Sequence, residues 1–598
     1  MCRIAGIADK SLPKEALVSI TKIMCDILRH GGPDDEGIYA DPDHHLLLGN
    51  RRLALIDLGI GGHQPMSYSD GRYHITYNGE IYNHRDLKNE LKNAGYTFRT
   101  QSDTEVILAA FAAWGTNSFI KFNGMFAFAL WDQQTADLYL VRDASGIKPL
   151  YYAAGKEHIV FASEIRAFKA VSYLQEKDPD WQVYMMAYGH LPEPVTTLKD
   201  VKPLAKGSFI QYNIPTGSFK MQAFTQYSFT EKIDDKAEAL ELIKCSMKKA
   251  VTRHLFSDAP IGIFLSGGVD SAIIAKLAKS EQDTCLNTLS IFFEEEKYSE
   301  KKYQDILMDK LAGNHHGFLL KEKEFHDHLP GIINDMDLPG SDGINTWFIS
   351  KYAKDSGLKS VLSGIGADEL FGGYPSFGRM GKTIMLEKLP NSILRSGRFT
   401  NSKILRRLCY LSLHSAQGKF LFLRGQFIPG EIAAHLNADE KEIWSILEQP
   451  LYKEDISHLT VKNQASWMEI NFYLQNQLLR DADVMSMIHG LEIRVPYLDN
   501  ELMNLVLQIQ SNIKYAGTLS KQLLIDAFKN LLPEAVWNRA KMGFSFPFTE
   551  WLTKDEYIIN TLNNPGQKGI NNYQKFVEGS LHWSQLMTLM LLEKSHEN

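Results

Sequence analysis

Cysteine, long apolar runs and a surplus of positive charge are all scarce in this chain. Only 5 of its 598 residues are Cys, and they are widely spaced, so neither a disulfide framework nor a metal cluster is expected. No uninterrupted apolar run is long enough to span a bilayer. The formal net charge of −7 argues against a general nucleic-acid binder. The beginning of the chain lacks the basic and apolar regions of a secretory signal, so we expect a cytoplasmic protein.

A chain of this length is expected to form two or more domains, and its two halves differ in periodicity. Residues 1–215 carry short alternating segments, which predict antiparallel sheets packed with a few helices. Residues 236–598 predict a parallel α/β sheet with added helices, because strand-like runs alternate with amphipathic stretches. The polar stretch 216–235 is the predicted linker. The predicted strands are 45–55, 74–77, 126–131, 137–142, 158–162, 261–265, 288–293 and 360–362, and the predicted helices include 14–28, 104–114, 237–255, 301–311 and 347–356.

The most informative segment is Ser266-Gly-Gly-Val-Asp-Ser271, which follows an apolar run and precedes a helical one. Unpaired N–H groups at a helix N-terminus favour phosphate, and Gly267 and Gly268 let the backbone approach an anion closely. The two serines can donate hydrogen bonds. Asp270 would repel a bare phosphate, so it is predicted to bind Mg²⁺ beside one. The alternative is a plain glycine-rich turn.

Cys2 is the second informative residue. Removal of the initiator Met would make it the first residue, with an α-amino group of pKa roughly 7.7–8.0 that can accept the thiol proton. A lone Cys near a terminus is usually incidental, so its neighbours decide the interpretation. They include the motifs Arg29-His-Gly-Gly-Pro-Asp-Asp-Glu-Gly37, Arg51-Arg-Leu-Ala-Leu-Ile-Asp57, Tyr77-Asn-Gly-Glu-Ile-Tyr-Asn83, Ser102-Asp-Thr-Glu105 and Phe122-Asn-Gly-Met-Phe-Ala-Phe128.

Together with Cys2, these motifs closely resemble the class II glutamine amidotransferases, whose fold is an αββα sandwich of the N-terminal-nucleophile type. The resemblance implies that Arg52 holds the α-carboxylate of glutamine, while Glu80 and Asp103 are candidates for its α-ammonium. Asn78 and the Gly79 N–H would form the oxyanion hole. Taken singly, the arginine could serve a surface ion pair, Asn78-Gly79 a hairpin, and Asp103 a helix cap.

The second half resembles the N-type ATP pyrophosphatases, and in particular the synthetase domain of glutamine-hydrolysing asparagine synthetases. The match includes Ser363-Gly-Ile-Gly-Ala-Asp-Glu-Leu-Phe-Gly-Gly-Tyr374, Glu492-Ile-Arg-Val-Pro-Tyr-Leu-Asp499 and Lys541-Met-Gly-Phe-Ser-Phe-Pro547. It implies ATP and Mg²⁺ as cofactors, Asp270 and Asp368 as metal ligands, and Lys541 as a lysine that stabilises developing charge. The alternative for Asp368 is a solvated loop, and the alternative for Lys541 is a surface lysine. The implied ATP-binding residues are Leu265, Ser266, Gly267, Gly268, Asp270, Ser271, Ile291, Ser363 and Gly364.

The two resemblances imply one reaction. Ammonia released from glutamine at Cys2 would pass through an internal tunnel, for which Met487 is a lining candidate, and amidate a carboxylate activated as an acyl-adenylate. L-Aspartate is the default acceptor. The expected partners are small-molecule substrates, with no nucleic acid and no membrane span. The sequence leaves open whether the chain forms a homodimer.

The chain departs from the family pattern at several positions. Arg3 replaces the usual Gly after the nucleophile, and Asn50 a frequent His. Ile365 stands where asparagine synthetases carry an acid, and the segment 337–346 is altered, so a sugar acid or another carboxylate is an alternative acceptor. The stretch 389–430 has seven Lys or Arg and no acid, which indicates either a solvated insertion or a lid for an anionic substrate. Two weaker alternatives are an amide-forming cyclase and a regulatory scaffold without activity. They are weaker because the residues of the glutaminase site and of the ATP site are all present.

Overall fold

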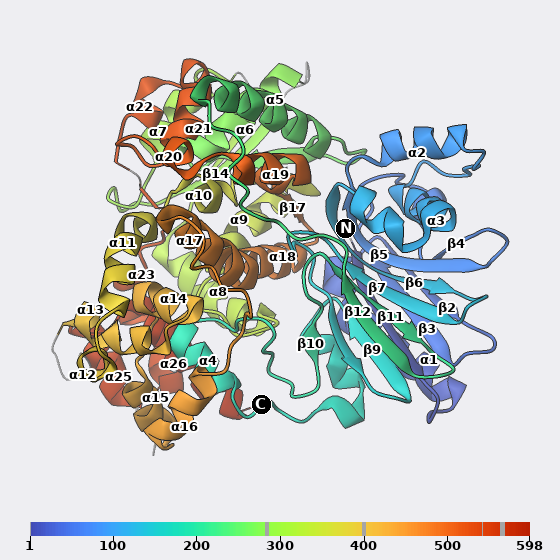
Figure 1. Cartoon of the computed structure of the whole chain (residues 1–598), viewed down its shortest axis with the longest axis horizontal. Coiled ribbons are helices and arrows are strands. Elements are labelled where there is room, and N and C mark those ends of the chain that lie inside the picture. Colours follow the sequence, from blue (N-terminus) through green and yellow to red (C-terminus); the bar gives the residue numbers. More distant parts are fainter. Residues whose placement is uncertain are drawn as a thin grey trace.

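Two antiparallel sheets of six strands form the N-terminal half of the molecule (Figure 1). The structure is a computed structural model that describes residues 2–281, 286–311, 313–396, 402–540, 542–543, 545–562 and 569–597. The strand orders are β10-β8-β9-β1-β3-β2 and β12-β11-β7-β6-β5-β4. The bounds are β1 (Cys2–Asp9), β2 (Asp35–Ala40), β3 (Leu46–Arg52), β4 (Met66–Tyr68), β5 (Tyr73–Ile81), β6 (Gly124–Asp132), β7 (Asp137–Arg142), β8 (Tyr151–Ala154), β9 (His158–Ala162), β10 (Lys202–Pro203), β11 (Ser208–Asn213) and β12 (Ser218–Ala223).

The two sheets lie face to face between two layers of helix. Side chains alternate along each strand, so one face of each sheet points into the space between the two sheets. Ile4 and Leu140 belong to the buried cluster that fills this space. Helix α1 (Lys14–Ile27) covers the outer face of the first sheet, with Leu17 beside Ile7 in a second cluster. Helices α2 (His84–Asn93) and α3 (Asp103–Trp114) cover the second sheet. The predicted αββα sandwich is confirmed.

Most predicted strands of this half lie within a residue or two of the observed ones, and those at 137–142 and 158–162 coincide with β7 and β9. The stretch 216–235 differs from its expectation. Its first part forms β12, which pairs with β11 along six residues and extends the second sheet. Its largely exposed side chains explain why the polar sequence did not indicate a strand.

A parallel sheet of five strands forms the centre of the C-terminal half, in the order β15-β14-β13-β16-β17. The first strand in sequence, β13, lies in the middle, and the chain adds strands first on one side and then on the other. That order creates a switch point between β13 and β16, where the loops at the carboxyl ends of the strands diverge and ligands bind in such sheets. The bounds are β13 (Ile261–Phe264), β14 (Asn287–Phe292), β15 (Asn314–Leu319), β16 (Ser360–Leu362) and β17 (Glu492–Arg494).

Helices surround this sheet. Helix α5 (Lys236–His254) begins where the Asp235 carboxylate accepts a hydrogen bond from the Glu238 N–H, which caps its first turn. Helices α5 and α6 share one buried cluster with β13, whereas α8 and α9 share another with Ile291. Further bounds are α6 (Val269–Glu281), α7 (Lys301–Met308), α8 (Glu322–Asp335), α9 (Ile344–Asp355), α10 (Ala367–Phe371), α11 (Pro375–Glu387), α14 (Ala416–Arg424), α17 (Val461–Met468), α18 (Arg480–Met487), α19 (Asn500–Gln508) and α21 (Gln522–Phe528).

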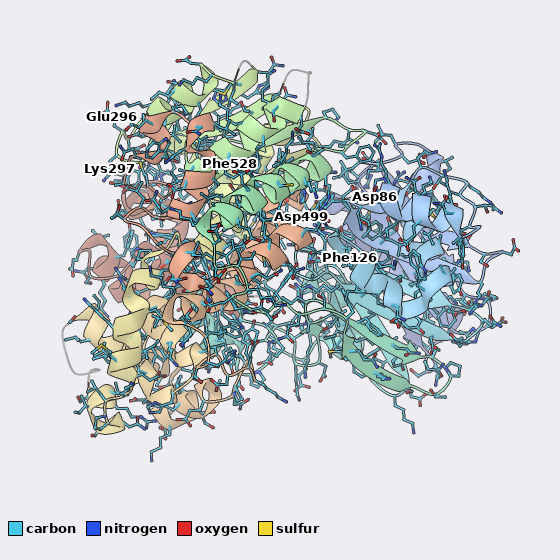
Figure 2. The ribbon with its side chains drawn as sticks, turned by 45° about the horizontal axis from the view of Figure 1, so that its top comes forward. Asp86, Phe126, Glu296, Lys297, Asp499 and Phe528 are labelled. Carbon is cyan, nitrogen blue, oxygen red and sulfur yellow. The ribbon has the colours of Figure 1, made fainter. Side chains whose placement is uncertain are left out.

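The two halves pack against each other through polar contacts. Figure 2 shows Asp499 on the side of the C-terminal half that faces Phe126 and the N-terminal sheets. Its carboxylate accepts a hydrogen bond from the Asn123 amide at 3.2 Å, while Asn500 donates to the Phe122 carbonyl. Within the part of the chain that the structure describes, none of the helices combines the length and apolar character that a membrane crossing needs.

Candidate active sites

Cys2 opens strand β1, opposite Arg52 of β3 in the register of the first sheet. Its side chain is buried, and its backbone N–H donates to the Asn78 side-chain oxygen at 3.2 Å. The Gln64 amide nitrogen lies 3.9 Å from the Cys2 sulfur. Burial raises the pKa of the Cys2 thiol, whereas the nearby Arg52 charge acts in the opposite direction. A Cys2 thiol that acts as the predicted nucleophile would therefore need a base to lose its proton at neutral pH.

Asn78 and Gly79 lie inside strand β5 and not in a hairpin turn. The Asn78 side-chain nitrogen is buried and has no hydrogen-bond partner among the described residues, which leaves a donor free beside the nucleophile. Gly79 adopts φ 151°, and a Cβ there would lie 2.1 Å from the Met125 carbonyl oxygen. Only glycine fits this backbone, because a side chain there would collide with the neighbouring strand β6.

The Arg52 guanidinium is held by main-chain carbonyls and not by a surface acid. It donates to Gly59 at 2.9 Å and to Ile56 at 3.2 Å, and it also contacts the Asp57 carbonyl. Among the described residues the neighbouring Arg51 pairs with Asp26 and Glu36, whereas the contacts of Arg52 are with carbonyl oxygens, so its charge is available for an anionic ligand.

The two acids predicted for the glutamine ammonium occupy different surroundings. The Asp103 carboxylate accepts from the Tyr77 hydroxyl at 2.9 Å and from the Ile81 N–H at 3.0 Å, and Ser102 is the residue that caps α3. Glu80 lies 3.6 Å from Arg494 of β17. Burial, together with the nearby Glu492 charge, raises the pKa of Glu80 well above its ordinary range.

Gln64 is a residue of this site that the sequence did not reveal. Its side-chain oxygen accepts from the Tyr77 N–H at 2.6 Å and from Asn50 at 3.2 Å, which directs its amide nitrogen toward Cys2. Asn50, one of the departures from the family pattern, thus supports the nucleophile's neighbour. Nothing in the local sequence around Gln64 marks it.

The glycine-rich loop after β13 is held by hydrogen bonds to the hydroxyl groups of its own serines. The Ser271 hydroxyl accepts from the Ser266 N–H at 3.2 Å, and the Ser266 hydroxyl accepts from the Gly268 N–H at 3.3 Å. Gly267 adopts φ 79°, which favours glycine. Helix α6 begins directly after this loop, so its first N–H groups face the switch point.

A cavity of about 630 Å³ lies at the switch point. The loop after β16 reaches it as well, because a Cβ on Gly364 would lie 3.0 Å from the Asp270 Cβ. Of the predicted ATP and metal residues, all but Gly267 line the cavity. The lining ones are Leu265, Ser266, Gly268, Asp270, Ser271, Ile291, Ser363, Gly364 and Asp368.

Lys521 joins the two predicted metal ligands and was not foreseen from the sequence. Its Nζ lies 2.5 Å from Asp270 and 2.7 Å from Asp368, and its side chain is 7% exposed. The two carboxylates hold the pKa of Lys521 above its ordinary range despite burial. Lys541 lies outside the described residues. Its neighbours Ala540 and Met542 line the cavity, as does Arg539, which pairs with Glu300 at 2.7 Å.

The far end of the cavity is acidic. Asp342, Asp481 and Glu369 line it; Arg480 pairs with Asp481 at 3.3 Å, and the Tyr374 hydroxyl donates to Glu369 at 2.8 Å. Burial raises the pKa of Asp481 to about 7 and that of Glu369 to about 8, and each also has another acid nearby. This end therefore suits a ligand with a positive group.

Much of the basic stretch 389–430 is paired within the molecule. Ion pairs join Lys419 to Glu387 and Arg424 to Glu469, both at 2.9 Å. Similar pairs are Arg395 with Glu448 and Arg406 with Glu431, while Arg407 donates to carbonyls. Arg398 lies outside the described residues. These contacts favour a packed insertion over a lid for anions.

The fold and the sites together define a class of two-domain, glutamine-dependent amidotransferases. In this class an αββα sandwich with Cys2 at its first strand is joined to a parallel sheet with a glycine-rich loop. Comparison with known families and relatives agrees. The family described as asparagine synthase matches residues 243–575, and the one described as glutamine amidotransferase domain matches residues 1–225. The chain therefore belongs to the asparagine synthase family, and it is an enzyme of the glutamine-hydrolysing asparagine synthetase type.

Individual relatives agree over nearly the whole length. The chain is 31% identical to glutamine-hydrolysing asparagine synthetase 1 of Bacillus subtilis strain 168, over 94% of this chain and 90% of that protein. It is 30% identical to asparagine synthetase 3 of the same organism, over 91% and 87%. A solved glutamine phosphoribosylpyrophosphate amidotransferase from B. subtilis, complexed with ADP and GMP, aligns at 16% identity over 53% of this chain and 81% of its own, with a TM-score of 0.29.

Proposed function

We propose that this enzyme transfers the amide nitrogen of glutamine to L-aspartate, which ATP activates as an acyl-adenylate, and so forms L-asparagine. The observation that carries the proposal is the convergence of Asp270 and Asp368 on one cationic group at the switch point. Two loops of the parallel sheet bring these carboxylates together beside a phosphate-type loop. We also propose a cytoplasmic location, which the scarcity of cysteine supports.

At the first site, the Cys2 sulfur would attack the side-chain carbonyl carbon of glutamine. The α-amino group freed by removal of Met1 takes the thiol proton and returns it to the departing ammonia. Asn78 and the Gly79 N–H stabilise the oxyanion, and Arg52 with an acidic partner orients the substrate. Water then attacks the thioester carbon, which releases glutamate and restores the thiol.

The donor set at the second site fits Mg²⁺. Carboxylate oxygens are its preferred ligands, and one or two of them suffice because the ion keeps waters and binds substrate phosphates. No cluster of three or more His, Cys, Asp and Glu suited to a metal occurs among the described residues. Asp270 and Asp368 would hold the ion, and when bound it would offset the charge on pyrophosphate as that group leaves.

The chain's own groups would carry the remaining steps. A carboxylate oxygen of the acceptor attacks the α-phosphorus of ATP, and the bond to the bridging oxygen breaks to release pyrophosphate. Ammonia then attacks the acyl carbon, loses a proton and displaces AMP. Lys521 is placed to stabilise phosphate charge during these steps, since its ammonium group already lies between two anions in a buried site.

The acidic end of the cavity supports aspartate over a sugar acid as acceptor. Asp342 and Asp481 would attract the α-ammonium of an amino acid and repel an acceptor that carries only negative charge. Ile365 supplies no acid–base group, but ammonia that arrives unprotonated through the protein needs no base. The basic stretch offers little free charge for a nucleotide sugar, because its described cations are largely paired.

A pyrophosphate-release assay tests this function. The purified enzyme is given MgATP and a panel of carboxylates, aspartate first and sugar acids among them, with glutamine, with ammonia or with neither. Aspartate should support release with both nitrogen sources, and AMP should accompany pyrophosphate. Finding ADP and phosphate would refute the adenylate. Release with a larger carboxylate, and little with aspartate, would establish the alternative acceptor.

A further inference from the structure

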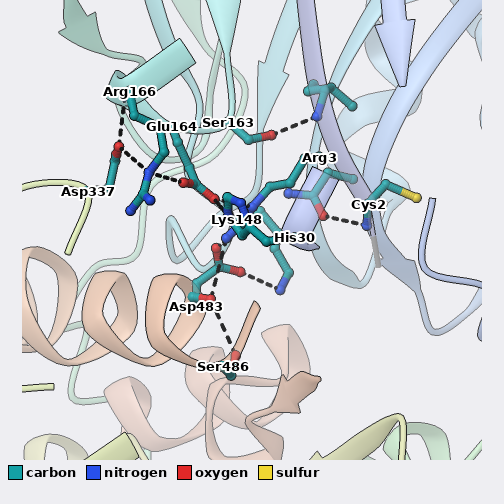
Figure 3. A network of polar contacts seen from close by, with 12 residues as sticks. Cys2, Arg3, His30, Lys148, Ser163, Glu164, Arg166, Asp337, Asp483 and Ser486 are labelled. Atoms are coloured by element: carbon teal, nitrogen blue, oxygen red, sulfur yellow. Dashed lines mark hydrogen bonds and ion pairs between the residues drawn. The ribbon is translucent and has the colours of Figure 1, made fainter. Parts of the chain in front are cut away.

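Arg3, the residue after the nucleophile, is fully buried against two carboxylates (Figure 3). Its guanidinium forms ion pairs with Glu164 and with Asp483, each at 2.6 Å. Successive residues of a strand point to opposite faces, so Arg3 projects away from the side on which Cys2 presents its sulfur. Glu164 belongs to the glutaminase half, whereas Asp483 lies on α18 of the synthetase half. The backbone that carries the nucleophile is therefore tied directly to the other half.

The pair belongs to a larger buried network at the junction (Figure 3). Lys148 also binds Asp483, at 2.9 Å, and Arg166 lies 2.8 Å from Glu164 and 3.4 Å from Asp337. Three cations thus meet three carboxylates. All three cations come from the glutaminase half, and two of the three carboxylates come from the synthetase half. His30 adds a contact to Glu164 at 2.9 Å.

Pairing outweighs burial at two of the three carboxylates, whereas burial raises the pKa of Asp337. Burial alone would favour the neutral acids, yet Arg3 and Lys148 hold the pKa of Asp483 below its ordinary value. Arg3 and its neighbours act in the same way on Glu164. Both carboxylates therefore stay charged, and the ion pair keeps its full strength over the physiological range of pH.

Helix α18 carries side chains toward both active sites. Residues two apart on a helix point about 200° apart, so Asp481 and Asp483 project to opposite sides. Asp481 lines the synthetase cavity, and Asp483 reaches the nucleophile strand. Met487, one turn beyond Asp483 on the same side, is fully buried. A shift of α18 relative to β1 would therefore move Asp481 and Met487 relative to Cys2.

We propose that Arg3 is a positioning residue: through Asp483 it fixes the nucleophile strand against α18, so that ammonia released at Cys2 reaches the synthetase cavity and does not escape. This inference rests on the proposed function, because it requires ammonia to travel between the two sites. The Arg3 side chain need not touch substrate. Displacements of about 1 Å far from the chemistry can cost ~10²-fold in rate, so a loosened junction should be measurable.

The test measures how much glutamate the full-length enzyme forms for each pyrophosphate released. Wild type should give close to equal amounts. Asp483→Asn and Arg3→Met should raise glutamate per pyrophosphate by about threefold or more, while the rate with ammonia stays within about twofold of wild type. Arg3→Lys keeps the charge and should recover part of the coupling. Lys177→Met is the matched control, because the Lys177 Nζ forms another contact between the halves, donating to the Ser595 carbonyl at 3.2 Å.

Three results would overturn the proposal. One is an unchanged ratio in folded Asp483→Asn and Arg3→Met. Another is a parallel loss of both activities with a lowered unfolding temperature, which would assign Arg3 to stability alone. The third is an equal rise in the Lys177→Met control. If Arg3→Met does not fold, Asp483→Asn and Arg3→Lys decide the question. Failure of the proposed function itself would look different, since wild type would then release no pyrophosphate with ammonia and aspartate.

Discussion

The ammonium group of Lys521 lies 2.5 Å from a carboxylate oxygen of Asp270. Asp368 approaches the same nitrogen from a second loop, at 2.7 Å. A buried cation held by two acids from separate loops fixes the geometry at the centre of the cavity. If those acids hold Mg²⁺, as proposed, the lysine would be free to contact phosphate oxygens, so its charge should matter in the synthetase reaction.

Lys521→Met should lower amide synthesis by roughly 10²–10³-fold with either nitrogen source, because one donor to developing charge is lost. Glutamine hydrolysis at Cys2 should continue. The measurement is pyrophosphate release with ammonia, run beside glutamate formation. Lys529→Met, at a lysine that is half exposed, is the control. Equal synthesis by Lys521→Met and wild type would contradict the role.

Cys2→Ala should abolish glutamine hydrolysis and glutamine-dependent synthesis, since no other group can form the thioester. Synthesis with ammonia should remain largely intact because the second site has its own chemistry. Mass spectrometry of purified wild type should show Met1 removed. A mutant that still hydrolyses glutamine at the normal rate would rule out the nucleophile.

Asp270→Asn and Asp368→Asn should each block synthesis with both nitrogen sources. Either change removes a negative charge where the ion would bind, and a buried site offers little water to compensate. Basal glutaminase activity is the internal control. Raised Mg²⁺ should recover part of the activity of these variants, and normal synthesis in both would argue that the ion binds elsewhere.

Aspartate should bind more tightly as the pH rises through about 7, where Asp481 ionises in the folded protein. The ionised carboxylate attracts the ammonium of the acceptor, so the KM for aspartate should fall over this range and Asp481→Asn should flatten the profile. The effect on stability has the opposite sign. Because the folded-state pKa lies above the ordinary value of 3.8, the unliganded protein should lose stability as the pH rises through about 7. Unfolding temperatures with and without aspartate check both signs.

Local sequence patterns predicted much of the fold and some of the residues of the candidate sites. Alternating segments predicted β7 and β9 because each strand has one face against a buried layer. The loop at Ser266 could be found because its glycines, serines and acid are consecutive. Lys521 could not, since it meets Asp270 across 251 positions of sequence and only the packing of the domain brings them together.

The same limit applies to the junction and to short strands. Asp483 lies 480 positions from Arg3, and nothing in either local sequence predicts their contact. Strand β17 has three residues, too few to show a period of its own. The fold class and the chemistry of the sites therefore follow from sequence motifs, whereas the groups that hold the sites in place follow from tertiary structure.

The balanced charges at the junction make the two halves poor candidates for exchange between relatives. A glutaminase half expressed alone would keep Arg3, Lys148 and Arg166 with Glu164 as their acid, and removal of a partner from a buried pair typically costs about 3–5 kcal/mol. An Arg3→Gly variant of the whole chain would instead leave Asp483 with Lys148 alone. We therefore expect relatives that keep an arginine at position 3 to keep an acid at the position of Asp483 as well.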